Sequence, residues 1–260
     1  AINLKFFLND DNKKIDFAII GFPPIEASVV FSNWLRFNKI PHIFDIKDLW
    51  PEYFFERIKN KFLSSIIKLI FLIHDYYLKK ALKNCSGITT NNNFFLKYIL
   101  KKIKRNKSKN DRVIYLTKEY INYKSLLPLK KKNFKKKSFN IYFCGRLNLD
   151  VFDFETVLKS LSILKQKKIN FHFYIGGYGE IEKLKNLINK LKLNYNVTLL
   201  GFVNKYNHSV FLRNCNLFIA PFYNNMNFSS NLSNKFIEAV QYKLPILTPL
   251  KKDVAKFILK

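Results

Sequence analysis

The segment from Phe218 to Pro249 carries residues whose types and spacing suit chemistry on a phosphate. This segment contains, in order, an apolar run, a polar loop rich in Asn and Ser, a helical pattern and a second apolar run. The first amides of a helix lack helical partners and lie at the positive end of its dipole, so those of Ser233, Asn234 and Lys235 would suit a phosphate. One turn later, the carboxylate of Glu238 could accept hydrogen bonds from two adjacent sugar hydroxyls, as in a ribose. On chemistry alone, a solvated helix glutamate and a surface lysine explain the pattern equally well.

The composition indicates a globular protein with an excess of positive charge. The chain has 260 residues, of which 48% are hydrophobic and 17% aromatic, so it can bury a full core in one large or two ordinary domains. The net charge of +28 favours anionic partners: nucleic acid, an acidic membrane or an anionic substrate. A richness in Lys, Asn, Ile and Phe also fits an AT-rich coding bias. Charge alone therefore does not choose a function.

Cysteine and histidine positions give no metal or disulfide pattern. Three cysteines lie far apart without a C-x-x-C pair, which fits a reducing compartment, and the four histidines lack metal spacing. No apolar run is long enough for a membrane span, and no signal peptide is visible. We therefore expect a cytoplasmic protein without a bound metal. The chain begins at Ala1 without an initiator methionine and is expected to end just past a strand, as a fragment would.

The N-terminal half opens with a predicted strand, helix and strand. Apolar runs at Phe17–Ile20 and His42–Ile46 flank a helical pattern, and Pro23 and Pro24 end the first run. Such a unit is a right-handed crossover in a parallel sheet. Polar residues follow its second strand at the edge where open sheets bind ligands, although turn and helix-capping roles would also explain the aspartates. These residues are Asp45, Lys47 and Asp48.

The helical pattern of Ile58–Asn84 has an apolar stripe and many lysines. The stripe contains Ile58, Phe62, Ile66, Leu69, Ile73 and Tyr76. Such a basic amphipathic helix could lie on an anionic membrane. A helix packed on a core with a solvated basic face explains the pattern nearly as well.

A Lys-rich stretch divides the chain into two predicted domains. It contains KKKNFKKK and lacks the interleaved aromatics of a nucleic-acid site, so we interpret it as a linker and consider nucleic acid an unlikely partner. We predict an N-terminal domain over residues 1–125, a linker over 126–138 and a second domain over 139–260.

The second predicted domain places further candidate ligands at strand ends. Asn140–Cys144 reads as a strand, and Gly145 and Arg146 follow it, so that the guanidinium could reach a diphosphate. Gly177 lies in the turn GGYGE, and Val203 lies in a loop expected to border a base. Strands and helices alternate throughout, as doubly wound sheets require.

Four motifs resemble those of one enzyme family. SNKFIEAVQYKLPIL resembles the donor-binding segment of family 4 glycosyltransferases, and DIKDLWPE resembles the D-x-R-D-L-W-P segment of members that build bacterial surface polysaccharides. GFPP and GRLNLDVFDFETVL also match segments of that family. Four positions depart from its pattern. Ser230 replaces a first carboxylate, Val151 a lysine and Lys47 an arginine, and Lys243 or Leu244 stands where the family has the glycine of a G-x-P strand.

The resemblance implies the GT-B architecture, in which two Rossmann-like α/β domains face each other across a cleft, here shortened at both ends. It also implies transfer of a sugar from a nucleotide-diphosphate donor to a hydroxyl acceptor that is expected to be lipid-linked, with retention of configuration and without a metal or other cofactor. Arg146, Lys235 and Glu238 would be the catalytic residues. The donor would contact Gly145, Arg146, Gly177, Val203, Ser230, Ser233, Asn234, Lys235 and Glu238. The acceptor side would contain Pro23, Pro24, Lys47 and Asp48.

Two alternatives remain open from sequence. A nucleotide-sugar epimerase on the same fold would need acid and base carboxylates that we cannot place. A basic scaffold that binds membrane or nucleic acid would tolerate the departures at Ser230 and Val151. The sequence does not name the donor base, the sugar, the acceptor or the oligomeric state.

Overall fold

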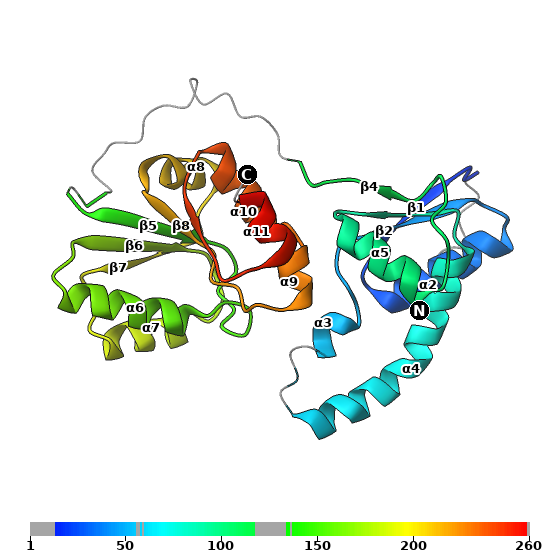
Figure 1. Ribbon diagram of the computed structural model, residues 1–260, viewed down its shortest axis with the longest axis horizontal. Coiled ribbons are helices and arrows are strands. Elements are labelled where there is room, and N and C mark those ends of the chain that lie inside the picture. Colours follow the sequence, from blue (N-terminus) through cyan, green and yellow to red (C-terminus); the bar gives the residue numbers. More distant parts are fainter. Residues whose placement is uncertain (1–13, 56–57, 59, 118–133, 136, 259–260) are drawn as a thin grey trace. The chain divides into compact units, whose positions relative to one another are not determined.

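The computed structural model describes residues 14–55, 58, 60–117, 134–135 and 137–258. It divides into two compact units, each an α/β structure built on a parallel sheet (Figure 1). The first unit comprises residues 1–116 and 225–231, and the second comprises 117–224 and 232–260. The predicted division assigned all residues after 139 to one domain, whereas residues 225–231 pack with the first unit.

The first unit contains a four-stranded sheet in the order β1-β2-β3-β4. Its strands are β1 (Ala18–Phe22), β2 (His42–Ile46), β3 (Gly87–Thr90) and β4 (Arg112–Val113). Its helices are α2 (Ile25–Phe37), α3 (Glu52–Phe55), α4 (Lys61–Asn84), α5 (Asn93–Lys102) and α9 (Met226–Ser230). The pairing of β1 with β2 is parallel, as the crossover predicted. The polar loop expected around residues 225–231 instead contains the short helix α9.

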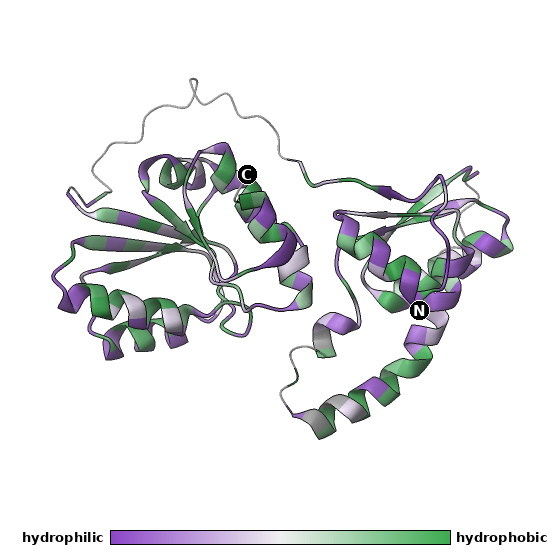
Figure 2. Cartoon of the chain, in the orientation of Figure 1, coloured by the Kyte–Doolittle hydropathy of each residue, from purple (hydrophilic) through white to green (hydrophobic). Residues whose placement is uncertain are grey.

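Helix α4 exposes its apolar stripe. The C-terminal part of the helix packs into the core through Leu78, Ala81 and Leu82. The predicted stripe does not belong to this packed part, because Phe62, Ile66, Leu69, Ile73 and Tyr76 are all exposed, Leu69 at 67%. Figure 2 shows that hydrophobic and hydrophilic residues alternate along the helix. The alternative in which this stripe packs on the core is therefore wrong. Within the described part of the chain, no helix is both long and apolar enough to cross a bilayer.

The second unit contains a five-stranded parallel sheet in the order β7-β6-β5-β8-β9. Its strands are β5 (Phe139–Cys144), β6 (Phe171–Gly176), β7 (Val197–Gly201), β8 (Leu217–Ile219) and β9 (Ile246–Leu247). Its helices are α6 (Phe154–Gln166), α7 (Ile181–Lys190), α8 (Lys205–Asn214), α10 (Asn234–Gln241) and α11 (Lys252–Ile258). Helices α6 and α7 lie on one face of the sheet, and α8 and α10 on the other (Figure 1).

Two elements of the second unit correct the sequence analysis. Helix α8 was not predicted, although Asn204 caps it by accepting a hydrogen bond from the Asn207 amide at 2.8 Å. Helix α11 follows β9, so the described chain does not end just past a strand. Residues 126–133 and 136 of the predicted linker lie outside the described residues.

A buried carboxylate lies directly before β4, the edge strand of the first sheet, and contacts the neighbouring strand β3. Asp111 is fully buried and accepts hydrogen bonds from the amides of Ile88 (2.8 Å) and Ser108 (2.7 Å). It also forms an ion pair with the guanidinium of Arg105. Removing one partner of a buried pair leaves the other charge uncompensated.

We therefore predict that Asp111→Ala lowers the free energy of unfolding of the first unit by about 3–5 kcal/mol. Urea titration followed by tryptophan fluorescence measures this unit selectively, because both tryptophans of the chain, Trp34 and Trp50, lie in it. Glu26→Ala is the control, since its exposed contact with His74 at 3.6 Å is expected to contribute about 0–1 kcal/mol. Equal shifts for the two variants would contradict the assignment.

Candidate functional site

Three glycine-containing turns meet at the carboxyl ends of β5, β6 and β7. The amide of Gly145 donates to Gly176 O at 3.0 Å, and that of Gly177 donates to Gly201 O at 2.6 Å. Gly177 has a φ of +136°, and a Cβ there would lie 1.7 Å from Gly145 O, so only glycine fits. These turns therefore pack closely against one another at the edge where parallel sheets bind ligands.

The side chain of Lys235 lies against this row of glycines. A Cβ on Gly145 would lie 2.5 Å from Lys235 Cε, and Lys235 Nζ lies 5.6 Å from the centre of the Phe152 ring. Burial lowers the pKa of Lys235, because the ammonium form is poorly solvated. The alternative of a surface lysine is therefore wrong.

No anion among the described residues compensates Lys235. The ammonium has no carboxylate within salt-bridge distance in the described part of the chain. The nearby thiol of Cys144 does not supply a negative charge, because burial raises its pKa and keeps it protonated near neutral pH. A buried cation without a partner is costly, so this position favours an incoming anion.

The start of α10 adds hydrogen-bond donors to the same region. Ser233 is the N-cap residue, but its side chain makes no capping bond, and its buried Oγ has no partner among the described atoms. The amides of Asn234 and Lys235 make no backbone hydrogen bond within the described residues. The helix has no acidic residue in its first turn. These donors and the ammonium together form a site for an anion such as a phosphate.

Arg146 follows Gly145 on the same loop and is exposed. Its guanidinium forms no ion pair among the described residues. Because Gly145 touches Lys235, the loop brings Arg146 into the neighbourhood of the ammonium. The structure thus groups Gly145, Arg146, Gly177 and the start of α10, and their role in binding a donor stays a prediction.

Glu238 is held by two residues that the sequence analysis missed. Its Oε2 lies 3.0 Å from His208 Nε2, and His208 Nδ1 lies 2.8 Å from the Tyr142 hydroxyl. The side chains of His208 and Glu238 are 15% and 14% exposed. The alternative of a solvated helix glutamate is therefore wrong. The described part of the chain contains no group of three or more His, Cys, Asp or Glu residues arranged to hold a metal ion.

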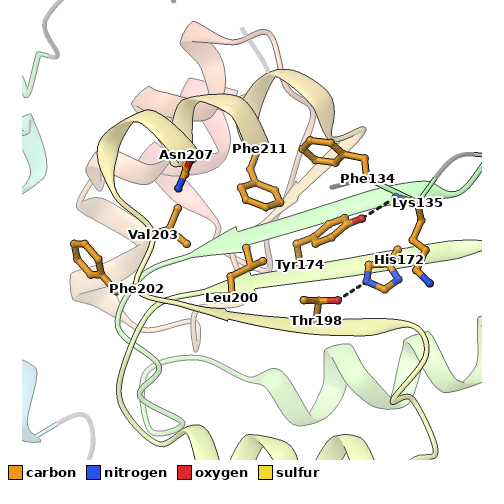
Figure 3. Close-up of a pocket in the computed structure, with 10 residues that line it drawn as sticks. All are labelled: Phe134, Lys135, His172, Tyr174, Thr198, Leu200, Phe202, Val203, Asn207 and Phe211. Atoms are coloured by element: carbon orange, nitrogen blue, oxygen red, sulfur yellow. Dashed lines mark hydrogen bonds between the residues drawn. The ribbon is translucent and has the colours of Figure 1, made fainter. Parts of the chain in front are cut away.

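A cavity of about 430 Å³ lies between α8 and the outer strands of the second sheet (Figure 3). Val203, predicted to border a base, lines it. His172 Nε2 lies 2.7 Å from Thr198 Oγ1, and burial lowers the pKa of His172, so the ring is neutral near pH 7. Aromatic rings of Tyr174 and Phe211 form much of the remaining wall.

The predicted acceptor-side residues lie together in the first unit. Pro23 and Pro24 connect β1 to α2, and Lys47 N donates to Phe22 O at 3.1 Å, which joins the ends of β1 and β2. Lys47 Nζ forms an ion pair with Asp45 at 3.0 Å. Ser230, predicted to contact the donor, is also in this unit, at the end of α9. Ser230 therefore belongs to a different unit from the other predicted donor residues.

Asparagine side chains tie α9 to the segment after β2. Asn227 Oδ1 accepts from the Leu49 amide at 3.1 Å. Asn231 Nδ2 donates to Lys47 O at 3.1 Å and to Asp48 Oδ1 at 3.2 Å. Asp48 is therefore an acceptor for the α9 segment within the first unit. These asparagines were not predicted, because their partners lie more than 170 residues away.

Comparison with known proteins agrees with this geometry. Residues 138–257 match the family described as "Glycosyl transferases group 1". The match extends from β5 to α11 and contains the grouped residues of the second unit. A search of curated proteins gave no match.

Solved glycosyltransferases share the fold of the chain. Anabaena Alr3699/HepE in complex with UDP-glucose has a TM-score of 0.63 at 13% identity, over 92% of this chain and 61% of HepE. Sucrose-phosphate synthase from Thermosynechococcus elongatus has a TM-score of 0.65 at 12% identity, over 94% of this chain and 58% of the synthase. WaaG, a glycosyltransferase involved in lipopolysaccharide biosynthesis, has a TM-score of 0.62 at 13% identity, over 90% of this chain and 66% of WaaG. The fold is therefore the GT-B fold, and the chain spans about three fifths of HepE and of the synthase.

We predict that Gly145→Ala weakens binding of inorganic pyrophosphate roughly tenfold, because a charge-assisted hydrogen bond contributes about 1.5–3 kcal/mol. The new methyl group must displace the end of the Lys235 side chain, which is flexible, so the melting temperature should change little. Isothermal titration calorimetry measures the affinity. Gly21→Ala is the control, since a Cβ there meets nothing within 4 Å. Unchanged pyrophosphate affinity in Gly145→Ala would count against the site.

Proposed function

We propose that the protein is a glycosyltransferase that moves a sugar from a nucleotide-diphosphate-sugar donor to a hydroxyl acceptor. The observation that carries this proposal is the buried, uncompensated ammonium of Lys235, which lies against the backbone of Gly145. The match of residues 138–257 to a glycosyltransferase family supports it. HepE, which has the same fold, is known in complex with UDP-glucose.

In the proposed reaction, the bond between the anomeric carbon and the β-phosphate oxygen of the donor breaks. A new bond forms between that carbon and the acceptor oxygen, and the hydroxyl proton passes to the released diphosphate. Lys235, Arg146 and the amides of Ser233 and Asn234 would stabilise the charge that develops on the diphosphate. We propose on the same basis that these groups do this work without a metal ion or another cofactor, and that configuration is retained, as the family resemblance implies.

The rest of the donor would be held by the second unit. Glu238 would accept hydrogen bonds from the two ribose hydroxyls. The cavity bordered by Val203 would receive the base, with its aromatic walls offering stacking surfaces. On the acceptor side, Lys47 and Asp48 would contact the sugar or its acceptor at the strand ends of the first unit.

We propose further that the acceptor is lipid-linked, in surface polysaccharide synthesis, and that α4 contacts the inner face of the plasma membrane. The exposed apolar side chains of α4 would enter the interface, and its lysines would face anionic headgroups. Lys68, Lys80 and Lys83 lie on this helix. This proposal is independent of the donor site and has its own test.

We predict that the 260-residue chain binds UDP or GDP in the micromolar range and that Lys235→Met weakens this binding about 10- to 100-fold. Diphosphate binding favours the ammonium and raises its pKa above the lowered value of the free protein. Affinity should therefore fall as the pH rises above neutrality through the lowered pKa of Lys235, and Lys235→Met should lose this part of the pH dependence. Calorimetry at several pH values measures both effects.

The matched control is Lys159→Met, which removes an exposed lysine on α6 and should leave nucleotide affinity unchanged. If the chain binds no nucleotide but binds RNA with a steep salt dependence, the glycosyltransferase proposal is contradicted and the alternative of a basic scaffold is favoured.

We predict that the double variant Leu69→Ser, Ile73→Ser lowers binding to vesicles containing phosphatidylglycerol by on the order of tenfold, because each side chain would lose part of its transfer free energy. Co-sedimentation with phosphatidylglycerol and pure phosphatidylcholine vesicles measures the effect. Ile163→Ser is the control, because this α6 residue is similarly exposed, at 53%. Vesicle binding that survives the double variant would exclude α4 as the contact.

A further inference from the structure

Four lysines with a left-handed backbone stand along one edge of the second sheet. Each lies in the segment that directly precedes a strand: Lys137 before β5, Lys168 before β6, Lys192 before β7 and Lys243 before β9. Their φ angles are 64°, 56°, 55° and 55°. Because the strands are parallel, their amino ends share one edge. Neighbouring strands lie about 4.8 Å apart, so the row extends over roughly 19 Å from β7 to β9.

The backbone at these positions suits glycine or asparagine better than lysine. A left-handed conformation is strained for most side chains, and asparagine is among the residues other than glycine that adopt it most readily. Yet every non-glycine residue with a positive φ in the described part of the chain is a lysine. The coding bias that fits the abundance of lysine fits asparagine equally well, so it does not explain this choice.

The helix dipole explains only part of the row. A cation just past the C-terminus of a helix is favourable, and three of the lysines follow α6, α7 and α10. Lys137, however, follows no helix among the described residues. Helices α6 and α7 also carry Lys165 and Lys190 in their own last turns. The positive charge at this edge therefore exceeds what the helices require.

No carboxylate offsets this charge along the edge. The four lysines are exposed and form no ion pair with the described residues. The segments before the strands, residues 137–138, 167–170, 191–196, 215–216 and 242–245, contain no acidic residue. The acidic residues described in the second unit lie in segments that follow strands or within α6, α7, α10 and α11. These are Asp150, Asp153, Glu155, Glu180, Glu182, Glu238 and Asp253.

A row of exposed cations without intervening carboxylates suits a planar anionic surface. Sites for single-stranded nucleic acid stack successive bases on aromatic rings, whereas Tyr195, at 86% exposure, is the only exposed aromatic residue in the segments before the strands. Anionic lipid headgroups need no such rings, and each lysine within about a Debye length of them adds to the attraction. The chemistry of the edge therefore favours a lipid surface over nucleic acid.

We propose that the lysine edge, formed by Lys137, Lys168, Lys192 and Lys243, is a contact surface for an anionic lipid membrane. The contact is electrostatic and belongs to the second unit, so it is separate from the apolar contact proposed for α4 in the first unit. The anion site of Lys235 lies at the opposite, carboxyl edge of the same sheet, so a bound membrane would leave it accessible. The inference does not depend on transfer of a sugar.

The test replaces all four lysines of the edge by asparagine in the 260-residue chain, because asparagine removes the charge and tolerates the left-handed backbone. Co-sedimentation with vesicles of phosphatidylglycerol and phosphatidylcholine measures binding. The variant should bind roughly 100- to 600-fold more weakly, since each lysine near an anionic surface raises the affinity about fivefold. Its melting temperature should not fall. Wild-type binding should also weaken between about 0.1 M and about 1 M salt, because the Debye length shortens.

Two further variants control for net charge. Arginine at the same four positions keeps the charge and should bind the vesicles within about threefold of the wild type. Glutamine at four exposed lysines outside the edge removes the same charge but should retain most of the binding; these are Lys159, Lys183, Lys185 and Lys251. Equal losses in the asparagine and glutamine variants would overturn the proposal, and so would an asparagine variant that binds like the wild type.

Fluorescence quenching gives a readout of position. A fluorophore attached to Tyr195→Cys, in the segment before β7, should be quenched by doxyl-labelled lipids. The same fluorophore on Tyr178→Cys, which is 61% exposed in the turn after β6 at the opposite edge, should be quenched less. The wild-type chain taken through the same labelling gives the background from the native cysteines. Stronger quenching at position 178 than at 195 would contradict the proposed orientation.

Two further measurements separate this inference from its alternatives. An RNA of about 20 nucleotides that binds through the four lysines, while phosphatidylglycerol vesicles do not bind, would assign the edge to nucleic acid and overturn the membrane contact. The asparagine variant should bind UDP like the wild type, because the lysine edge lies opposite the anion site. A wild-type chain that binds vesicles through this edge but binds no UDP would remove the proposed function and leave this inference standing.

Discussion

The organisation of the second unit depends on one electrostatic constraint, an ammonium that is buried against backbone rather than against a carboxylate. Lys235 reaches this position because Gly145 has no side chain to exclude it. Its desolvation lowers the pKa of the amine, and the protonated thiol of Cys144 does not offset the cost. The site therefore resembles one half of an ion pair, and an anion that enters it would complete the pair.

The aromatic content of the chain supplies the rigid base under this position. Phe143 packs edge-on against Phe152 and Phe154, each with a centroid distance of 5.0 Å. Phe222 lies 4.6 Å from Phe152 and 5.9 Å from Phe236, which belongs to α10. These rings connect the loop after β5 with the helix that carries Lys235 and Glu238. The high phenylalanine content, which from the sequence alone also fits a coding bias, therefore helps to fix the geometry of the site.

Sequence periodicity predicted the parts of the fold that depend on local burial, and it failed where distant contacts decide. Strand β2 was predicted with its observed bounds, because its apolar run is limited by turn residues. Helix α8 was missed because its sequence is rich in Asn, His, Ser and Tyr, which have weak helix propensity, and packing of Val210 and Phe211 stabilises it. His208 was missed with it. The α4 stripe was found, but amphipathicity alone does not say which side of a helix meets the core.

Burial, rather than net charge, separates the lysine that matters for the site from the lysines that support the fold. Lys102 is also largely buried, at 12% side-chain exposure, but its Nζ lies 2.6 Å from both Glu52 and Asp75. Lys102 therefore links α3, α4 and α5, and its charge is already compensated by two carboxylates of the protein. Lys235 is also only partly exposed, but it has no carboxylate partner among the described residues. In a chain with 46 basic and 18 acidic residues most lysines lack a carboxylate, but exposed ones are solvated and lose little by it. A lysine that has lost both its water and a counterion favours an incoming anion, because its charge is otherwise uncompensated.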